Sequence, residues 1–526
     1  MSIKTSRRGF LKGAAGLSAL GIAGFGHAAA RIPSGKIRLA AVGVMGKGYS
    51  DWMPMVKSGL AELVAWCDAD ESMRTKAINH KDTKKVPGLV EKLAKIPFYT
   101  DYRKMLDEQS TLQIDAMTIS TPDHMHAPVA IRAMKMGIHV YVQKPLVRTL
   151  WELDYFNKTA KENGVITQMG NQGSGTAGMR RGVEVLQSGI LGDVKEVHVW
   201  TNRPVWPQGF GAAEATKGAA DIIPPGLNWD AWLGTAKDRP FKGAYAPGKK
   251  GYDPWNICKN VYHPFSWRGF IDFGCGAFGD MACHTMNLPF RGLELEKVTK
   301  AECVMIEEKN DIAFPMKSKV KLTYAARESK ARPGTKLPEV TLFWYDGNVK
   351  PAADLMPQVI AAKIEKDKKT GKGKVPNTGC IVIGSKGILC STNDYGGASY
   401  IALNGEKAVQ NINEHPACKG IPVTLPRCGA AGGGMVKSDG AAALSADGHY
   451  TEFLTAILGK GPMFRETNSR CYSDVDFSIP IMEGILCGTV AQQVPGVLNW
   501  CSCKQQFDVA AANALLKPHI RKGFEF

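Results

Sequence analysis

IRLAAVGVMGKG, residues 37–48, is the stretch of sequence that decides the fold. Its first half, residues 37–42, is an apolar run typical of a buried strand. Its second half carries glycines at positions 43, 46 and 48 and leads into a helical pattern. A strand that ends in a glycine-rich turn and continues as a helix is typical of a nucleotide-binding βαβ unit. The stretch therefore predicts an α/β fold with a ligand site at the turn.

The turn departs from the dinucleotide-binding pattern G-x-G-x-x-G at one position. Gly43 and Gly48 occupy the first and third glycine positions, whereas Met45 occupies the second. The second glycine normally lets the backbone approach a pyrophosphate, and we expect Gly46, one residue later, to take this role. We interpret these residues, together with Lys47, as cofactor-binding.

The sequence beyond the turn continues the alternation of strands and helices. Three further apolar runs are typical of strands, at residues 62–67, 114–119 and 138–142. A helix is expected over residues 127–136, and the alternation predicts a parallel, doubly wound sheet. Ligands bind such sheets at the carboxyl ends of the strands, where Asp68, Thr121 and Lys144 fall. Asp68 lies 20 residues beyond Gly48, where an acid would accept hydrogen bonds from the adenosine ribose.

Length and charge limit the remaining interpretations. A chain of 526 residues is too long for one core, so two domains are expected. The net charge is +17, but the basic residues are scattered apart from the run at 363–374, which we interpret as a solvated loop. No zinc-finger, helix-turn-helix or RNA-binding signature is present, so no nucleic-acid partner is expected. A metal pair at His124 and His126 is not expected either, because no acid or cysteine spacing supports it.

The first 30 residues read as an export signal. Residues 6–12, SRRGFLK, form a twin-arginine motif, a weakly apolar stretch follows, and Ala28-Ala29-Ala30 fits the small-residue cleavage rule. The twin-arginine route carries folded proteins, so the leader indicates a cofactor inserted before export. We expect a periplasmic or secreted protein without membrane insertion after cleavage. No stretch reaches the roughly 18 apolar residues of a spanning helix.

Three further motifs match a known family. Residues 121–126, TPDHMH, resemble a TPxxxH segment; residues 143–145, QKP, resemble an EKP motif with Gln in place of Glu; residues 280–284, DMACH, resemble a DxxxH helix. Together with the glycine turn, these motifs resemble the Gfo/Idh/MocA family, named for glucose–fructose oxidoreductase and inositol dehydrogenase. The resemblance runs from about residue 37 to 290 and, more loosely, to the C-terminus. Phrases such as WRG at 267–269 resemble an exported subgroup of that family.

The resemblance implies a second domain with an open, mostly antiparallel sheet that covers the nicotinamide and carries the substrate. We therefore divide the chain into a signal peptide (1–30), an NAD-binding Rossmann domain (37–170) and a substrate and oligomerisation domain (171–526). Residues 196–200 and 340–344 show the two-residue alternation of side chains that is typical of strands, and we assign them to the sheet of the second domain. Residues 205–265 are interpreted as active-site loops, and residues 363–440 as a loop-rich insertion.

The resemblance also extends the list of expected site residues. Further cofactor-binding residues are Ser120, Thr121, Pro122, His126, Gln143, Lys144, Asn171 and Gln172. Expected substrate-binding residues are Lys144, Tyr262, Trp267, Arg268, Asp280 and His284. Six aromatic residues either stack on sugar faces or pack in a core, namely Trp206, Trp229, Trp232, Trp255, Tyr262 and Trp267. The family's glutamate is negative, so the neutral Gln143 removes its electrostatic effect on Lys144.

The expected catalytic residues are Lys144, Asp280 and His284. Asp280 and His284 are four apart, so they share one face of a helix. An alcohol oxidation needs a base, and the imidazole of His284 suits that role. Asp280 would orient this ring or hold a neighbouring hydroxyl, and the ammonium of Lys144 would polarise the reacting oxygen.

Three functions fit these residues. The first is an NAD-dependent oxidoreductase acting on a sugar, polyol or glycoside hydroxyl, with NAD favoured over NADP by Asp68 and held without dissociating. The second is an NAD-dependent glycoside hydrolase resembling α-N-acetylgalactosaminidases, although the WRG and GDMACH phrases do not look like that group's. The third is a catalytically silent carbohydrate-binding protein, which the presence of Lys144 and His284 disfavours. A homo-oligomer, dimer or tetramer, is expected.

Overall fold

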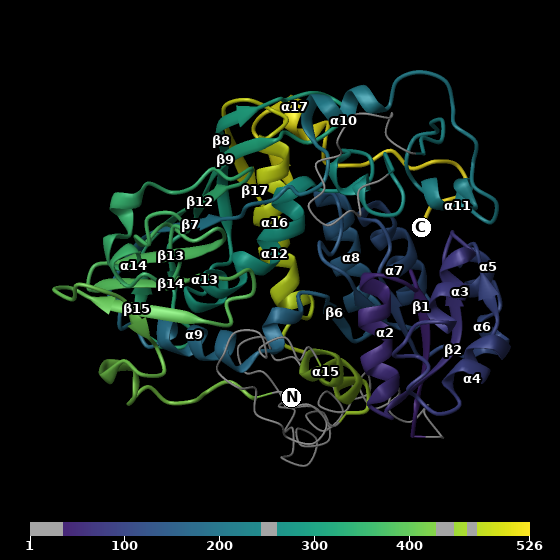
Figure 1. Cartoon of the computed structure of the whole chain (residues 1–526), viewed down its shortest axis with the longest axis horizontal. Helices are drawn as coiled ribbons and strands as arrows, with labels where there is room; N and C mark the ends of the chain where they lie inside the picture. The colour runs from purple at the N-terminus through teal and green to yellow at the C-terminus, as the bar shows by residue number, and fades with distance from the viewer. Residues whose placement is uncertain (1–34, 244–259, 428–446, 460–470) are drawn as a thin grey trace, which may run out of the picture.

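The computed structural model describes residues 35–243, 260–427, 447–459 and 471–526 (Figure 1). The predicted leader and Trp255 lie outside the described residues. Within the described ranges, no helix combines the length and the apolar character that crossing a bilayer requires. Figure 1 shows two sheets, one in each half of the molecule, with helices α12 and α16 between them.

The N-terminal sheet has six parallel strands in the order β3-β2-β1-β4-β5-β6. Its strands are β1 (Ile37–Val42), β2 (Ala61–Cys67), β3 (Phe98–Tyr99), β4 (Ala116–Ile119), β5 (His139–Val142) and β6 (Thr167–Met169). Its helices are α2 (Lys47–Lys57), α3 (Ser72–Ile78), α4 (Leu89–Lys95), α5 (Tyr102–Asp107), α6 (Gln109–Leu112), α7 (His126–Lys135) and α8 (Leu150–Asn163), with the short turn η1 (Asp123–Met125). The predicted parallel, doubly wound sheet is confirmed. Its strand order reverses between β1 and β4, which opens a crevice at their carboxyl ends.

The second sheet has ten strands in the order β16-β15-β14-β13-β7-β12-β9-β8-β17-β18. All its neighbours are antiparallel except β7 and β12, so the predicted, mostly antiparallel sheet is confirmed. The strands are β7 (Val194–Trp200), β8 (Val298–Glu307), β9 (Lys317–Tyr324), β12 (Val340–Tyr345), β13 (Gly379–Gly384), β14 (Gly387–Ser391), β15 (Ser399–Leu403), β16 (Gln410–Asn411), β17 (Val497–Cys501) and β18 (Gln506–Phe507). Strand β9, KSKVKLTY, alternates partly exposed lysines with buried residues, as expected of a sheet with one face toward solvent. Strands β10 (Arg327–Glu328) and β11 (Lys336–Leu337) form a separate hairpin.

The remaining helices belong mainly to the second half. They are α9 (Ala177–Gln187), α10 (Gly209–Ala215), α11 (Trp229–Leu233), α12 (Gly276–Thr285), α13 (Asn287–Gly292), α14 (Pro357–Ala361), α15 (Asp447–Ile457), α16 (Val475–Ala491) and α17 (Ala510–Asn513). The short turns are η2 (Gln172–Gly175), η3 (Ser266–Gly269), η4 (Ala353–Leu355) and η5 (Pro416–Cys418).

The interpretation of residues 363–440 as a loop-rich insertion is wrong in its middle part. Residues 379–403 supply strands β13, β14 and β15 of the large sheet. Strand β13, GCIVIG, is a short buried run between glycines, and a two-residue turn joins it to β14. Glycines at both ends of short strands resemble loop composition, which hid this hairpin from pattern reading.

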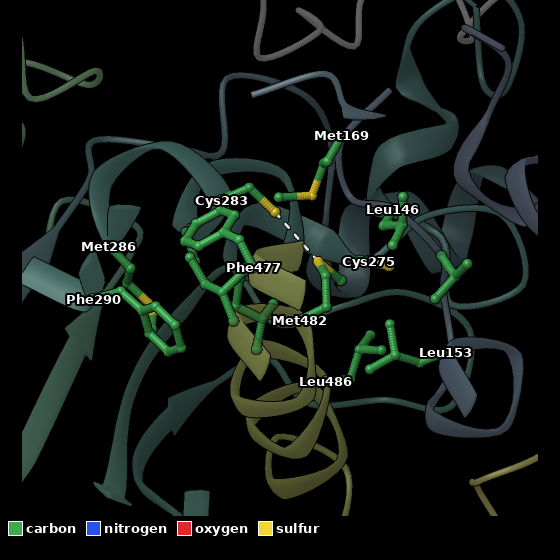
Figure 2. Packing of buried hydrophobic residues seen from close by; sticks show 14 of the residues in the cluster. Leu146, Leu153, Met169, Cys275, Cys283, Met286, Phe290, Phe477, Met482 and Leu486 are labelled. Atoms are coloured by element: carbon green, nitrogen blue, oxygen red, sulfur yellow. Dashed lines mark hydrogen bonds between the residues drawn. The ribbon is translucent and has the colours of Figure 1, made fainter. Parts of the chain in front are cut away.

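Helix α16 forms the common core of the two halves. It contacts α8 and β6 on the side of the parallel sheet and β8 and β9 on the other side. Its residues are almost all buried, as expected of a helix that is apolar all round. Figure 2 shows Met482 of α16 reaching Cys283 of α12, with 3.5 Å between the two sulfur atoms. This packing fixes α12, the predicted catalytic helix, against the centre of the molecule.

Helix α15 lies far along the chain but packs on the N-terminal sheet. Tyr450, Phe453 and Leu454 belong to the same buried cluster as residues of β1, β2 and α2. The carbonyl of His449 accepts a hydrogen bond of 2.7 Å from Gln168 of β6. The second half of the chain therefore contributes directly to the half that carries the glycine turn.

Candidate functional site

A cavity of about 930 Å³ lies at the carboxyl ends of the parallel strands and extends toward α12. Most of the predicted site residues line it, namely Gly43, Met45, Gly46, Lys47, Asp68, Ser120, Thr121, Pro122, Gln143, Lys144, Gln172, Trp267, Arg268, Asp280 and His284. One wall consists of the glycine turn and the ends of β2, β4 and β5. The opposite wall comes from residues 203–206, 260–268 and 394–395 together with α12.

The glycine turn is tight on one side and open on the other. A Cβ atom at Gly48 would lie 1.9 Å from the carbonyl oxygen of Gly43, so only glycine fits where α2 starts. Gly46 has a φ of +59°, and an added Cβ there would meet no atom within 4 Å. Gly46 therefore adopts the left-handed backbone on the open side of the turn, which agrees with the role expected for it in place of Met45.

Asp68 follows β2 and borders the cavity. Its carboxylate accepts hydrogen bonds from the backbone N–H groups of Val44 (3.0 Å) and Asp70 (3.1 Å). Burial raises the pKa of this carboxyl, and the two backbone donors oppose the rise. The carboxylate thereby ties the end of β2 to the glycine turn, and each oxygen keeps a second lone pair for a ligand hydroxyl.

Lys144, Asp280 and Arg268 form a charged cluster in the cavity. The Nζ atom of Lys144 donates to the carboxylate of Asp280 (2.7 Å) and to its backbone carbonyl (2.9 Å). Arg268 lies 3.4 Å from the same carboxylate. Burial alone would raise the pKa of Asp280, but the two cations lower it to about 2. Asp280 is therefore a permanent anion that holds the ammonium of Lys144 in place.

His284 lies one helical turn beyond Asp280 on α12. Burial, followed by the charge of Lys144, holds the pKa of its ring well below the usual 6.5, so the imidazole is neutral. Its Nδ1 atom is buried and has no hydrogen-bond partner. The ring packs edge-on against Tyr395, with centroids 4.8 Å apart. The neutral ring of a residue that lines the cavity is a suitable proton acceptor for a ligand.

The sequence left two roles for Asp280, orienting the ring of His284 or holding a neighbouring hydroxyl; among the described contacts, its carboxylate pairs with two cations and not with His284. The carboxylate of Asp280 is engaged by Lys144 and Arg268 instead. Helical spacing brings the two residues to one face, but two nearby cations attract the carboxylate more strongly than a neutral imidazole does. The pairing partner of Asp280 is therefore Lys144.

Asp123, which the motif contained but to which we assigned no role, also lines the cavity. Only 3% of the residue is exposed. Burial and the negative charge of Asp280 raise the pKa of Asp123 to about 7, against the opposing effects of Lys144 and Arg268. Two carboxyl groups of one cavity thus have pKa values pushed far apart, a pattern found where one carboxyl is kept charged and the other exchanges protons.

Three predicted site residues lie behind the cavity wall. Gly48 is buried against Gly43, and the side-chain amide of Asn171 faces the carbonyl of Cys283 at 3.5 Å. The ring nitrogens of His126 lie 2.7 Å from the carbonyl of Pro145 and 3.0 Å from that of Thr121. These three residues shape the loops that carry the site.

The expectation that Tyr262 binds substrate finds no support in its placement. Its ring packs in an aromatic cluster with Trp229, Trp232, Phe270 and Phe273. Of the aromatic residues left open by the sequence, Trp206, Trp232 and Trp267 border the cavity. Trp229 packs with Tyr262 in the core.

Several residues of the cavity were missed by sequence reasoning. Arg203 forms an ion pair with Asp394 at 3.3 Å, and Thr378 donates to the same carboxylate at 2.6 Å. Tyr395 packs on His284, as described above. Asp51 lies behind the cavity, where it contacts three lining residues. Only Asp51 left a signal in the sequence, because it stands four residues after Lys47 on one helix face.

These features fit a dinucleotide. The cavity is long enough to join the glycine turn to α12, and its turn leaves backbone open on the ligand side. Asp68 offers acceptors at the adenosine end, and Lys144 and His284 lie at the opposite end. Ligands of doubly wound sheets bind at this crevice, with the diphosphate at the start of the first helix.

Comparison with known proteins covers residues 37–171 at the level of a family model. Fold and cavity together define an α/β protein with a dinucleotide-binding domain and a second sheet domain. Residues 37–171 match the model of the GFO_IDH_MocA group, described as an oxidoreductase family with an NAD-binding Rossmann fold. This segment of the chain is therefore similar to the NAD-binding domain of that family.

Among curated proteins, two relatives carry glycosidase names. Glycosyl hydrolase family 109 protein 2 of Akkermansia muciniphila is 29% identical over 37% of this chain and 46% of its own length. An alpha-N-acetylgalactosaminidase of Shewanella oneidensis is 30% identical over 26% of this chain and 29% of its own. The chain thus spans less than half the length of these curated relatives.

Among solved structures, the whole fold recurs at low sequence identity. The inositol dehydrogenase homolog of Azotobacter vinelandii, complexed with NADH and myo-inositol, has a TM-score of 0.53 and 15% identity, covering 89% of this chain and 98% of that one. The WlbA dehydrogenase of Bordetella pertussis, in complex with NADH and UDP-GlcNAcA, has a TM-score of 0.51 and 13% identity, covering 89% and 99%. These similarities show the two-sheet fold.

Proposed function

We propose that the protein is an NAD-dependent oxidoreductase acting on a hydroxyl group of a sugar, polyol or glycoside. One observation carries the proposal: Lys144, held by Asp280, and the neutral His284 share one cavity with the glycine turn. Bound NAD supplies the hydride acceptor in this class of reaction. The chain itself must then orient the hydroxyl and take its proton.

His284 and Lys144 have separate roles in this reaction. The ring of His284, which lines the cavity, accepts the proton of the hydroxyl, for which a neutral imidazole is required. Lys144 uses two of its three N–H donors on Asp280, and the third stabilises negative charge on the reacting oxygen. Asp280 keeps the ammonium fixed during this step.

Asp68 favours NAD over NADP. It stands where the 2′-position of the adenosine ribose is expected, and NADP places a phosphate there. A single like-charge pair at 4 Å costs about 4 kcal/mol at an effective dielectric constant near 20. Even a quarter of this cost gives several-fold discrimination.

The leader at residues 1–30 supports export by the twin-arginine route to the periplasm or beyond. Outside the inner membrane there is no nicotinamide pool, so the cofactor must stay bound during turnover. Retention on dilution requires nanomolar affinity, about −12 kcal/mol. We include a homo-oligomeric state, a dimer or tetramer, in the proposal, and light scattering tests it.

A glycoside hydrolase with the same cofactor is the second candidate, and Asp123 favours it. Alcohol oxidation needs one proton acceptor, whereas elimination of a glycoside leaving group and the addition of water in its place need a second proton carrier. Asp123 has the pKa of such a group. The similarity to proteins named glycosyl hydrolase family 109 and alpha-N-acetylgalactosaminidase supports the same candidate.

Incubation with a panel of glycans, sugars and polyols, followed by mass spectrometry of cofactor and products, separates these functions. An oxidoreductase yields an oxidised sugar together with reduced cofactor or a reduced second substrate. A glycosidase releases sugar without net reduction. A protein that binds a panel sugar and produces neither change is the silent carbohydrate-binding protein, and this result would overturn the proposal.

A further inference from the structure

Asp51 is a buried residue of helix α2 and lies directly behind the glycine turn. Asp51 is 0% exposed, and the two oxygens of its carboxylate accept four hydrogen bonds. Lys47 Nζ and the Tyr450 hydroxyl donate to Oδ1 at 2.6 and 2.8 Å. The Ser120 hydroxyl and Gln143 Nε2 donate to Oδ2 at 2.7 and 2.9 Å. Every donor is a side chain, and Lys47 Nζ also donates to the Tyr450 hydroxyl at 3.0 Å. The carboxylate is therefore the group on which all four side chains converge.

The four donors come from four different elements. Lys47 starts α2, and Ser120 and Gln143 follow strands β4 and β5. These three residues line the cavity. Tyr450 belongs to α15, which the second half of the chain sends back onto the parallel sheet. Asp51 thus joins three parts of the cavity wall to one distant helix.

The negative charge of Asp51 explains why position 143 carries an amide and not a carboxylate. A glutamate at that position would place a second carboxylate within hydrogen-bond distance of Asp51, and two like charges in a buried site repel strongly. The amide of Gln143 donates instead. Position 143 is therefore neutral, as the sequence shows, but a carboxylate lies beside it on Asp51, in helix α2.

Lys47 is the one cation among the donors. Its side chain is 31% exposed on the cavity side, whereas Asp51 is fully enclosed. The charge of Lys47 reaches across the cavity, where it contributes to the lowered pKa of His284. Without Asp51, the ammonium would lose its buried counter-charge and its fixed position beside the turn.

We propose that Asp51 is the positioning residue of the cofactor site, the carboxylate that holds Lys47, Ser120 and Gln143 in the arrangement that receives the diphosphate. This inference rests on the proposed binding of NAD in the cavity. Positions 51 and 143 must together carry a single negative charge, so that one of them has a carboxylate and the other an amide. If Asp51 only connected its neighbours by hydrogen bonds, an uncharged side chain of the same shape would serve equally well.

A swap of the two groups tests the charge balance directly. Asp51→Asn removes the carboxylate, Gln143→Glu adds a second one, and the double variant exchanges them with little change of shape. NAD is the probe, and its affinity is measured by calorimetry together with the amount retained after gel filtration. We expect each single variant to bind NAD about tenfold or more weakly. The double variant should return to within about threefold of the parent, a non-additive result.

Two further variants control for loss of folding. Asp115→Asn changes a half-buried aspartate of the same domain that bonds the backbone of Arg38 and lies outside the cavity wall, and it should leave NAD affinity unchanged. Tyr450→Phe removes one donor but no charge and should weaken NAD about threefold with little change in Tm.

The outcomes separate this inference from the proposed function. A parent that binds no NAD overturns both. A parent that binds NAD, with Asp51→Asn binding as tightly, overturns the role of Asp51 alone. A double variant as weak as Asp51→Asn, an equal loss in Asp115→Asn, or an unchanged affinity in Tyr450→Phe each contradicts it as well.

Discussion

The two walls of the cavity are built in different ways. The glycine turn consists of residues close in sequence, and its backbone determines its shape: Gly48 fits only without a side chain, and Gly46 leaves the turn open. The charged wall at the α12 end of the cavity consists of side chains paired across long stretches of chain, such as Lys144 with Asp280 and Arg203 with Asp394. The shape of the turn therefore depends on the backbone, whereas the proposed chemistry depends on the placement of charges.

The strongest test of this division is removal of the catalytic side chains. Lys144→Ala and His284→Ala should each lower turnover about a thousandfold or more, because each acts on the reacting oxygen. Both variants should keep their cofactor, measured as NAD content of the purified protein. Lys135→Ala, an exposed lysine on α7, is the matched control. A near-normal rate in either catalytic variant, with a substrate that the parent converts, removes that residue from the mechanism.

The reverse test alters only the turn. Gly48→Ala forces a methyl group to within 1.9 Å of the Gly43 carbonyl, so the turn must open. We expect NAD binding to weaken about tenfold or more. Gly211→Ala in α10, where an added Cβ meets nothing, should bind NAD as the parent does. Calorimetric titration compares the two, and equal affinities would contradict the account of the turn.

The pH dependence of stability tests the charged wall. The pKa of Asp123 is raised from 3.8 to about 7, so the folded protein keeps this proton where the unfolded chain has lost it. The resulting stabilisation is fully present below pH 3.8 and is lost as pH rises through 7. Asp123→Asn stays neutral throughout, so its free energy of unfolding relative to the parent should rise by about 2 to 3 kcal/mol between pH 5 and 8. Urea unfolding at both pH values measures this, and a constant difference would show that Asp123 does not hold a proton near neutrality.

The smallest expected effect concerns the adenosine end. Asp68→Asn removes the like charge that disfavours a 2′-phosphate, so the preference for NAD over NADP should fall several-fold. Parallel titrations with the two dinucleotides give the ratio. Equal or tighter binding of NADP by the parent would contradict the assignment of Asp68.

The sequence predicted the parts of the site that depend on short spacing. The strand–turn–helix at residues 37–48 and the four-residue step from Asp280 to His284 follow from local geometry, and the structure has both. Pairings between distant segments were not predictable. Asp280 meets Lys144 because β5 and α12 end at the same crevice, and Tyr450 meets Asp51 because α15 folds back onto α2.

At two positions, Tyr262 and Gln143, the neighbouring sequence gave a misleading indication. Tyr262 stands among aromatic residues and glycines that are typical of a substrate loop, but its neighbours Trp229 and Phe273 enclose it in a core. Gln143 is neutral, and its sequence neighbours do not show that a carboxylate from α2 lies 2.9 Å away. In both cases the partner is distant in sequence and is fixed by packing alone.

The central claim is that this protein holds a nicotinamide dinucleotide as a resident cofactor. The most direct measurement is to purify the protein without added cofactor, denature it and quantify the released dinucleotide by mass spectrometry. The account predicts close to one NAD per chain and activity without added NAD. A protein that purifies empty and works only when NAD is supplied would contradict the retained cofactor and indicate a simple dehydrogenase.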